Sequence, residues 1–102
     1  MFIFQNNMGE DIGQVRIQKQ LCNGNVAVIG ISVDVKFRGQ GFASKMLLMS
    51  TDYFLVSNPG FFLSAYIKES NLISKLVFEK AGFKKLEIID YKNFRSYHLI
   101  KK

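Results

Sequence analysis

The sequence of 102 residues contains one cysteine, one histidine, one proline and no tryptophan. Cys22 has no second cysteine with which to form an internal disulfide, which favours a reducing compartment, and we expect the protein in the cytoplasm. His98 is the only histidine, so the sequence offers no cluster of metal-ligand residue types. We therefore expect no metal site.

Long runs of a single residue class are also missing. The apolar runs fall far short of the roughly 18 residues that a membrane span needs, and no basic-then-apolar leader opens the chain. We therefore expect a soluble protein without membrane contact. Lys and Arg number 14 against 8 acidic residues, yet no basic run exceeds two residues. The net charge of +6 favours an anionic partner, but no nucleic-acid-binding arm is visible.

The hydrophobic pattern predicts one mixed α/β domain over residues 1–102, since no linker, repeat or low-complexity tract divides the chain. Alternation with period two, followed by the turn Asn23-Gly24-Asn25, predicts an antiparallel hairpin whose second strand is buried on both faces. The predicted order is β-β-β-α-β-α-β-β. The strands are Phe2–Phe4, Gln14–Leu21, Val26–Val33, Phe61–Ile67, Phe83–Asp90 and Phe94–Lys101, and the helices are Phe42–Val56 and Asn71–Lys80.

The two predicted helices differ in how they place their side chains. In the first helix the spacing predicts a core face made of Phe42, Ala43, Met46, Leu47, Ser50 and Phe54. The second is predicted to start at an N-cap on Ser70, to bury Ile73, Leu76 and Val77, and to end before Gly82. Asn71, Ser74 and Phe78 then share the opposite face. On the residues alone, packing of Phe78 under a neighbouring strand is favoured over a ligand contact.

A glycine-containing turn between the third strand and the first helix indicates an anion site. Gly39 and Gly41 lack a Cβ, so the backbone there can adopt positive φ, and the helix that follows presents unpaired N–H groups. Arg38, Lys36 and Lys45 add positive charge to the same short segment. We interpret the segment as a phosphate-binding loop in preference to a plain connection.

Two familiar phosphate loops do not fit. A dinucleotide fingerprint requires a third glycine, but the chain has Ser44 at that position. It also requires an acidic residue roughly 20 positions later, where the chain has apolar and small residues around Gly60. The loop also follows an antiparallel hairpin instead of opening a βαβ series. A P-loop is excluded because no Gly-Lys-Ser or Gly-Lys-Thr follows.

Taken together, these segments resemble the Gcn5-related N-acetyltransferase (GNAT) family. Arg38, Gly41 and Ala43 match the family's pyrophosphate motif between a buried strand and a helix, and Asn71, Ser74 and the segment 78–83 resemble its second helix and helix exit. The resemblance is strong from residue 26 to residue 83. It implies a mostly antiparallel sheet, splayed open between the strand that ends at Val33 and the strand 61–67.

The resemblance also implies acetyl-coenzyme A as cofactor, bound in the gap between the splayed strands. Backbone groups of the third strand would pair with the pantetheine arm, amides of the glycine loop would hold the pyrophosphate, and the second helix would complete the site. The implied cofactor-binding residues are Ile31, Ser32, Val33, Arg38, Gly39, Gln40, Gly41, Phe42, Ala43, Ser44, Asn71 and Phe78.

The implied reaction is attack by a small-molecule amine, such as an amino sugar, on the acetyl thioester. The tyrosine that commonly serves as the acid in the family is Phe78 in this chain, and no Glu stands at Val28 or nearby to act as base. The remaining candidates for catalysis are Asp34, Tyr66 and Tyr97, with His98 beside them. A thiolate leaves tolerably without an acid, since a free thiol has a pKa of about 8.5.

The family usually begins with a strand and two helices that shape the acceptor pocket, whereas the first strand here corresponds to the next family strand. We therefore expect a homodimer or a partner domain to supply the missing wall. Two other functions stay open: a coenzyme-A-binding module without catalysis, and a basic RNA-binding domain. Salt-dependent binding of oligonucleotides and indifference to coenzyme A would identify the RNA-binding domain.

Overall fold

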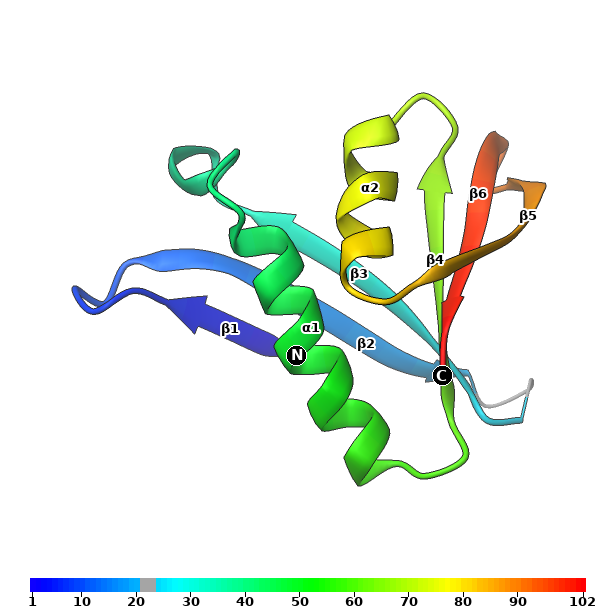
Figure 1. The fold of residues 1–102 in the computed structure, drawn as a ribbon, viewed down its shortest axis with the longest axis horizontal. Helices are drawn as coiled ribbons and strands as arrows, with labels where there is room; N and C mark the ends of the chain where they lie inside the picture. Colours follow the sequence, from blue (N-terminus) through cyan, green and yellow to red (C-terminus); the bar gives the residue numbers. More distant parts are fainter. Residues whose placement is uncertain (21–23) are drawn as a thin grey trace.

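Two helices lie on one face of a six-stranded sheet (Figure 1) in the computed structural model, which describes residues 1–20 and 24–102. The predicted order of strands and helices is confirmed, with one additional short 3₁₀ turn, η1. The elements are β1 (Phe2–Gln5), β2 (Asp11–Gln20), β3 (Val26–Val33), η1 (Val35–Phe37), α1 (Phe42–Ser57), β4 (Phe62–Lys68), α2 (Leu72–Lys80), β5 (Lys84–Tyr91) and β6 (Phe94–Lys101).

The sheet is antiparallel except between β3 and β4, and that pair is splayed. The strand order is β1-β2-β3-β4-β6-β5. The parallel ladder joins only residues 26–28 of β3 to residues 62–64 of β4, ending at the pair Val28 and Ser64. Beyond this pair the strands diverge, as Figure 1 shows for the cyan and yellow-green arrows. The predicted splayed sheet is confirmed.

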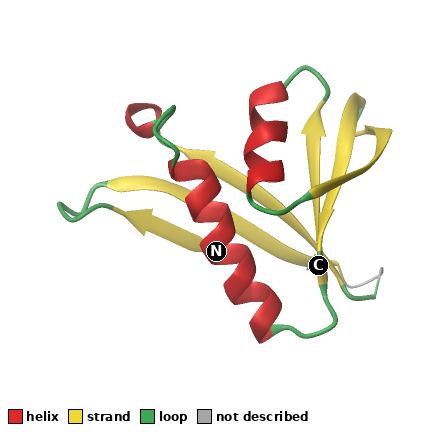
Figure 2. Ribbon diagram, in the orientation of Figure 1, coloured by secondary structure: helices red, strands yellow, loops and turns green. Residues whose placement is uncertain are grey.

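The hairpin of β2 and β3 forms as predicted, but β3 is buried on only one face. Ala27 and Ile29 are buried, whereas Val28 is partly exposed and Ser32 is exposed. The prediction of burial on both faces is wrong because α1 and α2 both lie on the same side of the sheet (Figure 2). Residues 21–23 lie outside the described part of the chain, and they include Cys22 and the first residue of the predicted turn at 23–25.

Helix α1 supplies much of the core. Its buried side chains are Met46, Leu47, Ser50, Thr51 and Phe54, close to the predicted face. The two hydroxyls stay satisfied because Ser50 Oγ donates to the carbonyl of Met46 at 2.8 Å and Thr51 Oγ1 donates to that of Leu47 at 2.6 Å. Four residues of the predicted core face are therefore confirmed as buried, Phe42 and Ala43 are only partly buried, and Thr51 is a buried residue that was not predicted.

Helix α2 presents a different face to the core from the one predicted. Its N-cap is Asn71, one residue later than the predicted Ser70, and Phe78 is its buried side chain. Ile73 and Leu76 are exposed, 78% and 59% respectively. Phe78 packs edge-to-face on Phe83, with ring centroids 5.1 Å apart. Apolar residues surround most of this short helix, so spacing alone could not select its core face.

The two remaining turns match their sequences. Gly82, directly after the C-cap of α2, has a φ of +98°, which is the left-handed conformation expected at that position. The hairpin of β5 and β6 turns at Lys92 and Asn93, whose φ values are +49° and +70°. Two consecutive positive φ values are typical of a two-residue hairpin loop. The chain then places β6 beside β4 and β5 at the edge of the sheet.

Candidate functional site

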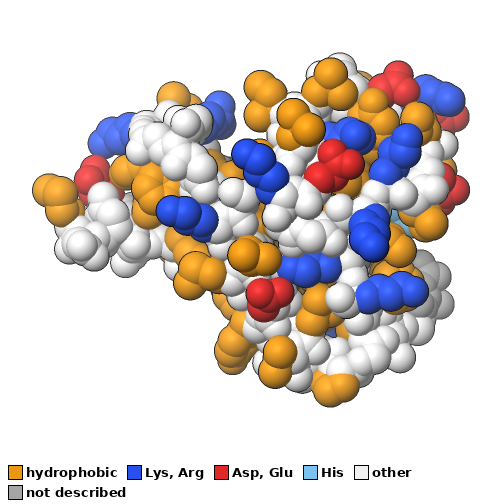
Figure 3. Space-filling view, viewed as in Figure 1, with side chains coloured by type: hydrophobic (Ala, Val, Ile, Leu, Met, Phe, Trp, Pro, Cys, Tyr) orange, Lys and Arg blue, Asp and Glu red, His pale blue; other side chains and the backbone are white. Residues whose placement is uncertain are grey.

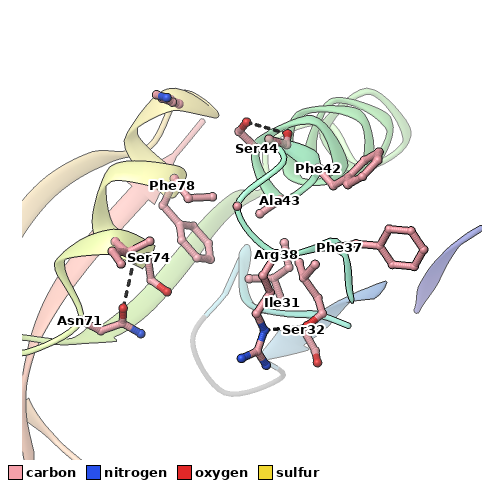
Figure 4. Close-up of a pocket in the computed structure, with 16 residues that line it drawn as sticks. Ile31, Ser32, Phe37, Arg38, Phe42, Ala43, Ser44, Asn71, Ser74 and Phe78 are labelled. Carbon is pink, nitrogen blue, oxygen red and sulfur yellow. Dashed lines mark hydrogen bonds between the residues drawn. The ribbon is translucent and has the colours of Figure 1, made fainter. Parts of the chain in front are cut away.

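A cavity of about 720 Å³ lies between the end of β3, the loop before α1, and α2 (Figure 4). It opens where β3 and β4 diverge. Eleven of the twelve predicted cofactor-binding residues line it, namely Ile31, Ser32, Val33, Arg38, Gly39, Gly41, Phe42, Ala43, Ser44, Asn71 and Phe78. Gln40 does not line the cavity, because its Nε2 donates to the carbonyl of Lys36 at 3.0 Å within the loop. Segments 40 residues apart in the sequence thus meet at one site.

The glycine loop has the backbone conformation that an anion cradle needs. Gly39 and Gly41 have φ values of +76° and +80°, and Gly41 is the N-cap of α1 without a side-chain cap. A Cβ added at either position would meet no atom within 4 Å, so glycine is needed for its backbone conformation and not for space. The N–H groups of the first turn of α1 lack intrahelical partners and lie at the cavity wall.

The cations around the loop are arranged differently from the prediction. Arg38 Nε donates to the carbonyl of Val33 at 3.1 Å, which holds its guanidinium beside the end of β3. Lys36 Nζ lies 3.4 Å from Glu10 Oε2, so this predicted anion ligand already has a carboxylate partner. Hydrogen bonding from Asn6 and the charge of Lys36 lower the pKa of Glu10. Within the described residues, Lys80 on α2 is the lysine that lines the cavity.

Lys80 is a cavity residue that sequence reasoning missed. Ile73, Val77 and Lys80 recur at spacings of four and three residues on α2, and all three line the cavity. The spacing was visible, but Ile73 and Val77 were assigned to the core face. Because Ile73 and Val77 line the cavity, Lys80 on the same side of α2 lines it too.

Asn71 and Phe78 form the wall of the cavity opposite the loop. Asn71 Oδ1 accepts from the backbone N–H of Ser74 at 3.2 Å and caps α2. Since the cap uses the amide oxygen, the amide nitrogen lies on the side of the group that faces Arg38 (Figure 4). Phe78 is 4% exposed and contributes an apolar surface to the cavity. Its predicted burial is confirmed, although its aromatic partner Phe83 directly precedes β5 and is not part of a strand.

The three catalytic candidates do not line this cavity. Asp34 Oδ1 accepts from the backbone N–H of Lys36 at 3.0 Å and caps η1. Tyr97 lies on the helix-bearing face, where Lys75 Nζ of α2 is 5.2 Å from its ring centroid. Tyr66 lies on the other face of the sheet, where its ring stacks on His98 with centroids 4.6 Å apart. Burial, followed by the charge of Tyr91, raises the pKa of Tyr66, which keeps its phenol neutral.

Charge on the helix-bearing face is predominantly positive. Figure 3 shows Lys and Arg side chains spread over this face with few acidic ones among them. Within residues 1–20 and 24–102, no helix is long and apolar enough to cross a membrane. The same residues contain no group of three or more His, Cys, Asp or Glu side chains that could hold a metal ion. The positive charge of the helix-bearing face suits an anionic ligand.

Comparison with known proteins gives a family match and a shared fold. The model of the acetyltransferase (GNAT) domain family matches residues 1–84. No curated protein matches the sequence. One similar solved structure is the aminoglycoside acetyltransferase AAC(6')-Ib in complex with coenzyme A and kanamycin, at a TM-score of 0.84 and 21% identity. The alignment covers 97% of this chain and 63% of that one.

Two further solved structures have the same fold. A spermidine N-acetyltransferase chimera from Vibrio cholerae and hSSAT aligns at a TM-score of 0.80 and 14% identity, over 96% of this chain and 63% of that one. A GNAT-family acetyltransferase from Bacillus anthracis aligns at 0.81 and 17%, over 93% and 60%. This chain thus spans less than two thirds of the length of these structures. At such identities the similarity establishes the fold, and the cavity lies within the part that is shared.

Proposed function

This chain belongs to the GNAT acetyltransferase domain family, and from that premise we propose that it binds acetyl-coenzyme A and transfers the acetyl group to a small-molecule amine. The observation that carries the proposal is the convergence of the glycine loop, the free end of β3 and the cap of α2 on one cavity. We also propose that residues 1–102 act as one domain, because a single core packs α1, α2 and the sheet together.

The residues around the cavity fit the chemistry of the cofactor part by part. The first turn of α1 and the guanidinium of Arg38 suit a pyrophosphate, with Lys80 adding charge from the opposite wall. Beyond Val28 the edge of β3 that faces β4 is no longer paired in the ladder. Its backbone groups can therefore pair with the amides of a pantetheine arm, as in strand addition. The Asn71 amide nitrogen supplies a further donor.

Bound acetyl-coenzyme A supplies a thioester that a neutral amine can attack, with the coenzyme A thiolate as leaving group. The chain's part is to hold that group against β3 and to direct a backbone N–H of the unpaired edge of β3, beyond Val28, at the carbonyl oxygen. Phe78 excludes water from the cavity wall but has no hydroxyl with which to protonate the thiolate. The names of two solved relatives, an aminoglycoside acetyltransferase and a spermidine N-acetyltransferase, support the proposed class of acceptor.

A melting-temperature screen followed by turnover tests this function. Acetyl-coenzyme A at one hundred times its dissociation constant should stabilise the fold by about 2.7 kcal/mol, whereas NAD and RNA should leave it unchanged. Aminoglycosides, spermidine and amino sugars are then tested for acetylation. No stabilisation by acetyl-coenzyme A, or stabilisation by RNA that falls with salt, would contradict the proposal.

The absent hydroxyl at Phe78 favours one second candidate, a module that binds coenzyme A without turning it over. The same screen separates the two functions. Stabilisation by acetyl-coenzyme A without acetylation of any amine in the panel would establish the binding module and exclude the transferase.

A further inference from the structure

A second set of polar side chains forms a hydrogen-bonded row across three strands. His98 Nε2 lies 3.1 Å from Ser64 Oγ, and His98 Nδ1 lies 3.2 Å from Glu87 Oε2. A carboxylate only accepts, so Nδ1 carries the proton and donates to Glu87. Nε2 is then the acceptor for the Ser64 hydroxyl. We call these three residues the polar row.

The polar row lies on the face of the sheet that α1 and α2 do not cover. Leu63, Ala65 and Ile67 of β4 belong to the core under the helices. Because side chains alternate along a strand, Ser64 and Tyr66 point to the opposite face. His98 is the cross-strand partner of Tyr66 and lies on that face with it.

A β-bulge in β5 brings the carboxylate to this face. Lys85 pairs with Leu99 and Glu87 pairs with His98, so Leu86 is the extra residue between them. Without the bulge, Leu86 would stand opposite His98 and Glu87 would turn toward the helices. Bulges are found next to active sites because they re-aim one side chain. Here the re-aimed side chain is the acidic member of the row.

The row stands at the apex of the splayed strands. Ser64 pairs with Val28, and this is the last pair of the parallel ladder before β3 and β4 diverge. A pantetheine arm anchored at the loop beside Gly41 and paired with β3 would run along β3 from Val33 toward Val28. Its thioester end would then lie on the side of Ser64. An amine that approaches from the face opposite the helices meets the same apex.

The surroundings of the row shield it from water. Ser64 is 2% exposed, and the His98 side chain is 12% exposed. The Tyr66 ring stacks on His98 and also on Tyr91, with the two tyrosine centroids 4.0 Å apart. The titratable groups that contact the His98 ring are thus Glu87 from β5 and Tyr66 from β4, with Tyr91 stacked on Tyr66. Hydrogen bonds in such a place are stronger than in water.

We propose that the polar row is the proton acceptor for the amine, an inference that rests on the proposed acetyl transfer. As the amine nitrogen forms its bond to the carbonyl carbon, its proton passes to Ser64 Oγ, and the Ser64 proton moves to His98 Nε2. The carbon–sulfur bond breaks and its electron pair leaves on the thiolate. Glu87 stabilises the imidazolium that results. Ser64 meets the substrate, and His98 and Glu87 act through it.

The split between kcat and cofactor affinity, measured with the amine that the panel identifies, tests the row. His98→Asn should lower kcat about 10²–10⁴-fold, because the proton acceptor is lost. Glu87→Gln should lower kcat by less, because the ring stays in place but the imidazolium loses its carboxylate partner. The dissociation constant for acetyl-coenzyme A should not change in either variant.

Serine variants provide a matched control. Ser64→Ala removes the relay hydroxyl and should lower kcat like His98→Asn. Ser96→Ala removes an equally buried serine of β6, whose hydroxyl donates to the carbonyl of Phe94, and should leave kcat unchanged. Glu87 is half exposed, so Glu87→Gln folds even if a variant of the more buried His98 does not.

The outcomes separate this inference from the proposed function. If the variants bind acetyl-coenzyme A and acetylate the amine with the wild-type kcat, the relay is overturned and the transferase stands. A wild-type kcat in Glu87→Gln alone also overturns the relay as proposed, because the imidazolium would then need no carboxylate. If the wild type binds acetyl-coenzyme A but acetylates no amine, the transferase and the relay are both overturned.

Discussion

At the scale of single residues, Gly41 joins backbone conformation to ligand chemistry. Its φ of +80° turns the chain into α1, and the same turn brings unpaired N–H groups to the cavity wall. The positive φ was predictable from the sequence because glycine, which lacks a Cβ, adopts this conformation without steric cost.

Gly41→Val should weaken acetyl-coenzyme A binding and lower stability. A β-branched residue in the left-handed region costs about 1–3 kcal/mol, although no atom obstructs its Cβ. Gly9→Val is the matched control, because Gly9 has a φ of +79° and equal space in the loop between β1 and β2. Both variants should lose similar stability in denaturant titrations. An equal loss of cofactor affinity in both would contradict the assignment.

Asn71 carries two roles that two substitutions separate. Asn71→Ala removes the cap of α2 and should cost about 0.5–2 kcal/mol of stability. Asn71→Asp keeps an oxygen acceptor for the Ser74 N–H but loses the amide donor toward the cavity. We therefore expect its melting temperature to stay close to that of the wild type while the dissociation constant for acetyl-coenzyme A rises. Unchanged affinity in Asn71→Asp would remove Asn71 from the site.

The polar row was the least predictable feature at this scale, since His98 alone of its three members was a candidate from the sequence. Ser64, Glu87 and His98 are separated by at least 11 positions in the sequence, and no spacing relates them. The register of β4 against β6 and the extra residue Leu86 in β5 bring them together. Neither feature leaves a local signal in the sequence.

At the scale of elements, α2 shows where periodicity fails as a guide. Leu72, Ile73, Leu76, Val77 and Phe78 give apolar surface on nearly every side of nine residues. The partner Phe83, which follows the helix exit, decides that Phe78 is the buried one. On the longer α1, Met46, Leu47, Ser50 and Phe54 of the predicted face are buried, although the exposed side also carries apolar residues such as Met49 and Val56.

Two substitutions on α2 measure which face is the core. Phe78→Ala should cost about 3–5 kcal/mol, since it empties a buried site against Phe83. Leu76→Gln should change stability by no more than about 0.5 kcal/mol, because Leu76 is 59% exposed. The free energy of unfolding from urea titration gives both values. A larger loss for Leu76→Gln than for Phe78→Ala would restore the face expected from spacing.

At the scale of the whole molecule, charge and topology act together. The splay between β3 and β4 creates the cavity, and the net charge of +6 favours anions over the entire surface. Composition predicted the sign of the ligand. The resemblance to the GNAT family predicted the splay, which depends on strand pairing over long sequence separations.

Binding of acetyl-coenzyme A should weaken as salt is added. The cofactor is a polyanion, and charges on an exposed surface are screened over about 8 Å at physiological ionic strength. Calorimetric titrations at low and high salt should show a rising dissociation constant. Lys80→Met should reduce this dependence, whereas Lys102→Met at the exposed end of the chain should not. An affinity that does not vary with salt would contradict a pyrophosphate held by charge.

Backbone amide NMR during titration with acetyl-coenzyme A tests most directly whether the cavity is the cofactor site. We predict that the largest shifts fall on residues 31–33, residues 39–44 and Asn71, with little change in β5. Shifts at residues 31–33 report contact with the pantetheine arm, and shifts at residues 39–44 report contact with the pyrophosphate. The absence of shifts at saturating cofactor, or shifts confined to residues outside the cavity, would contradict the account.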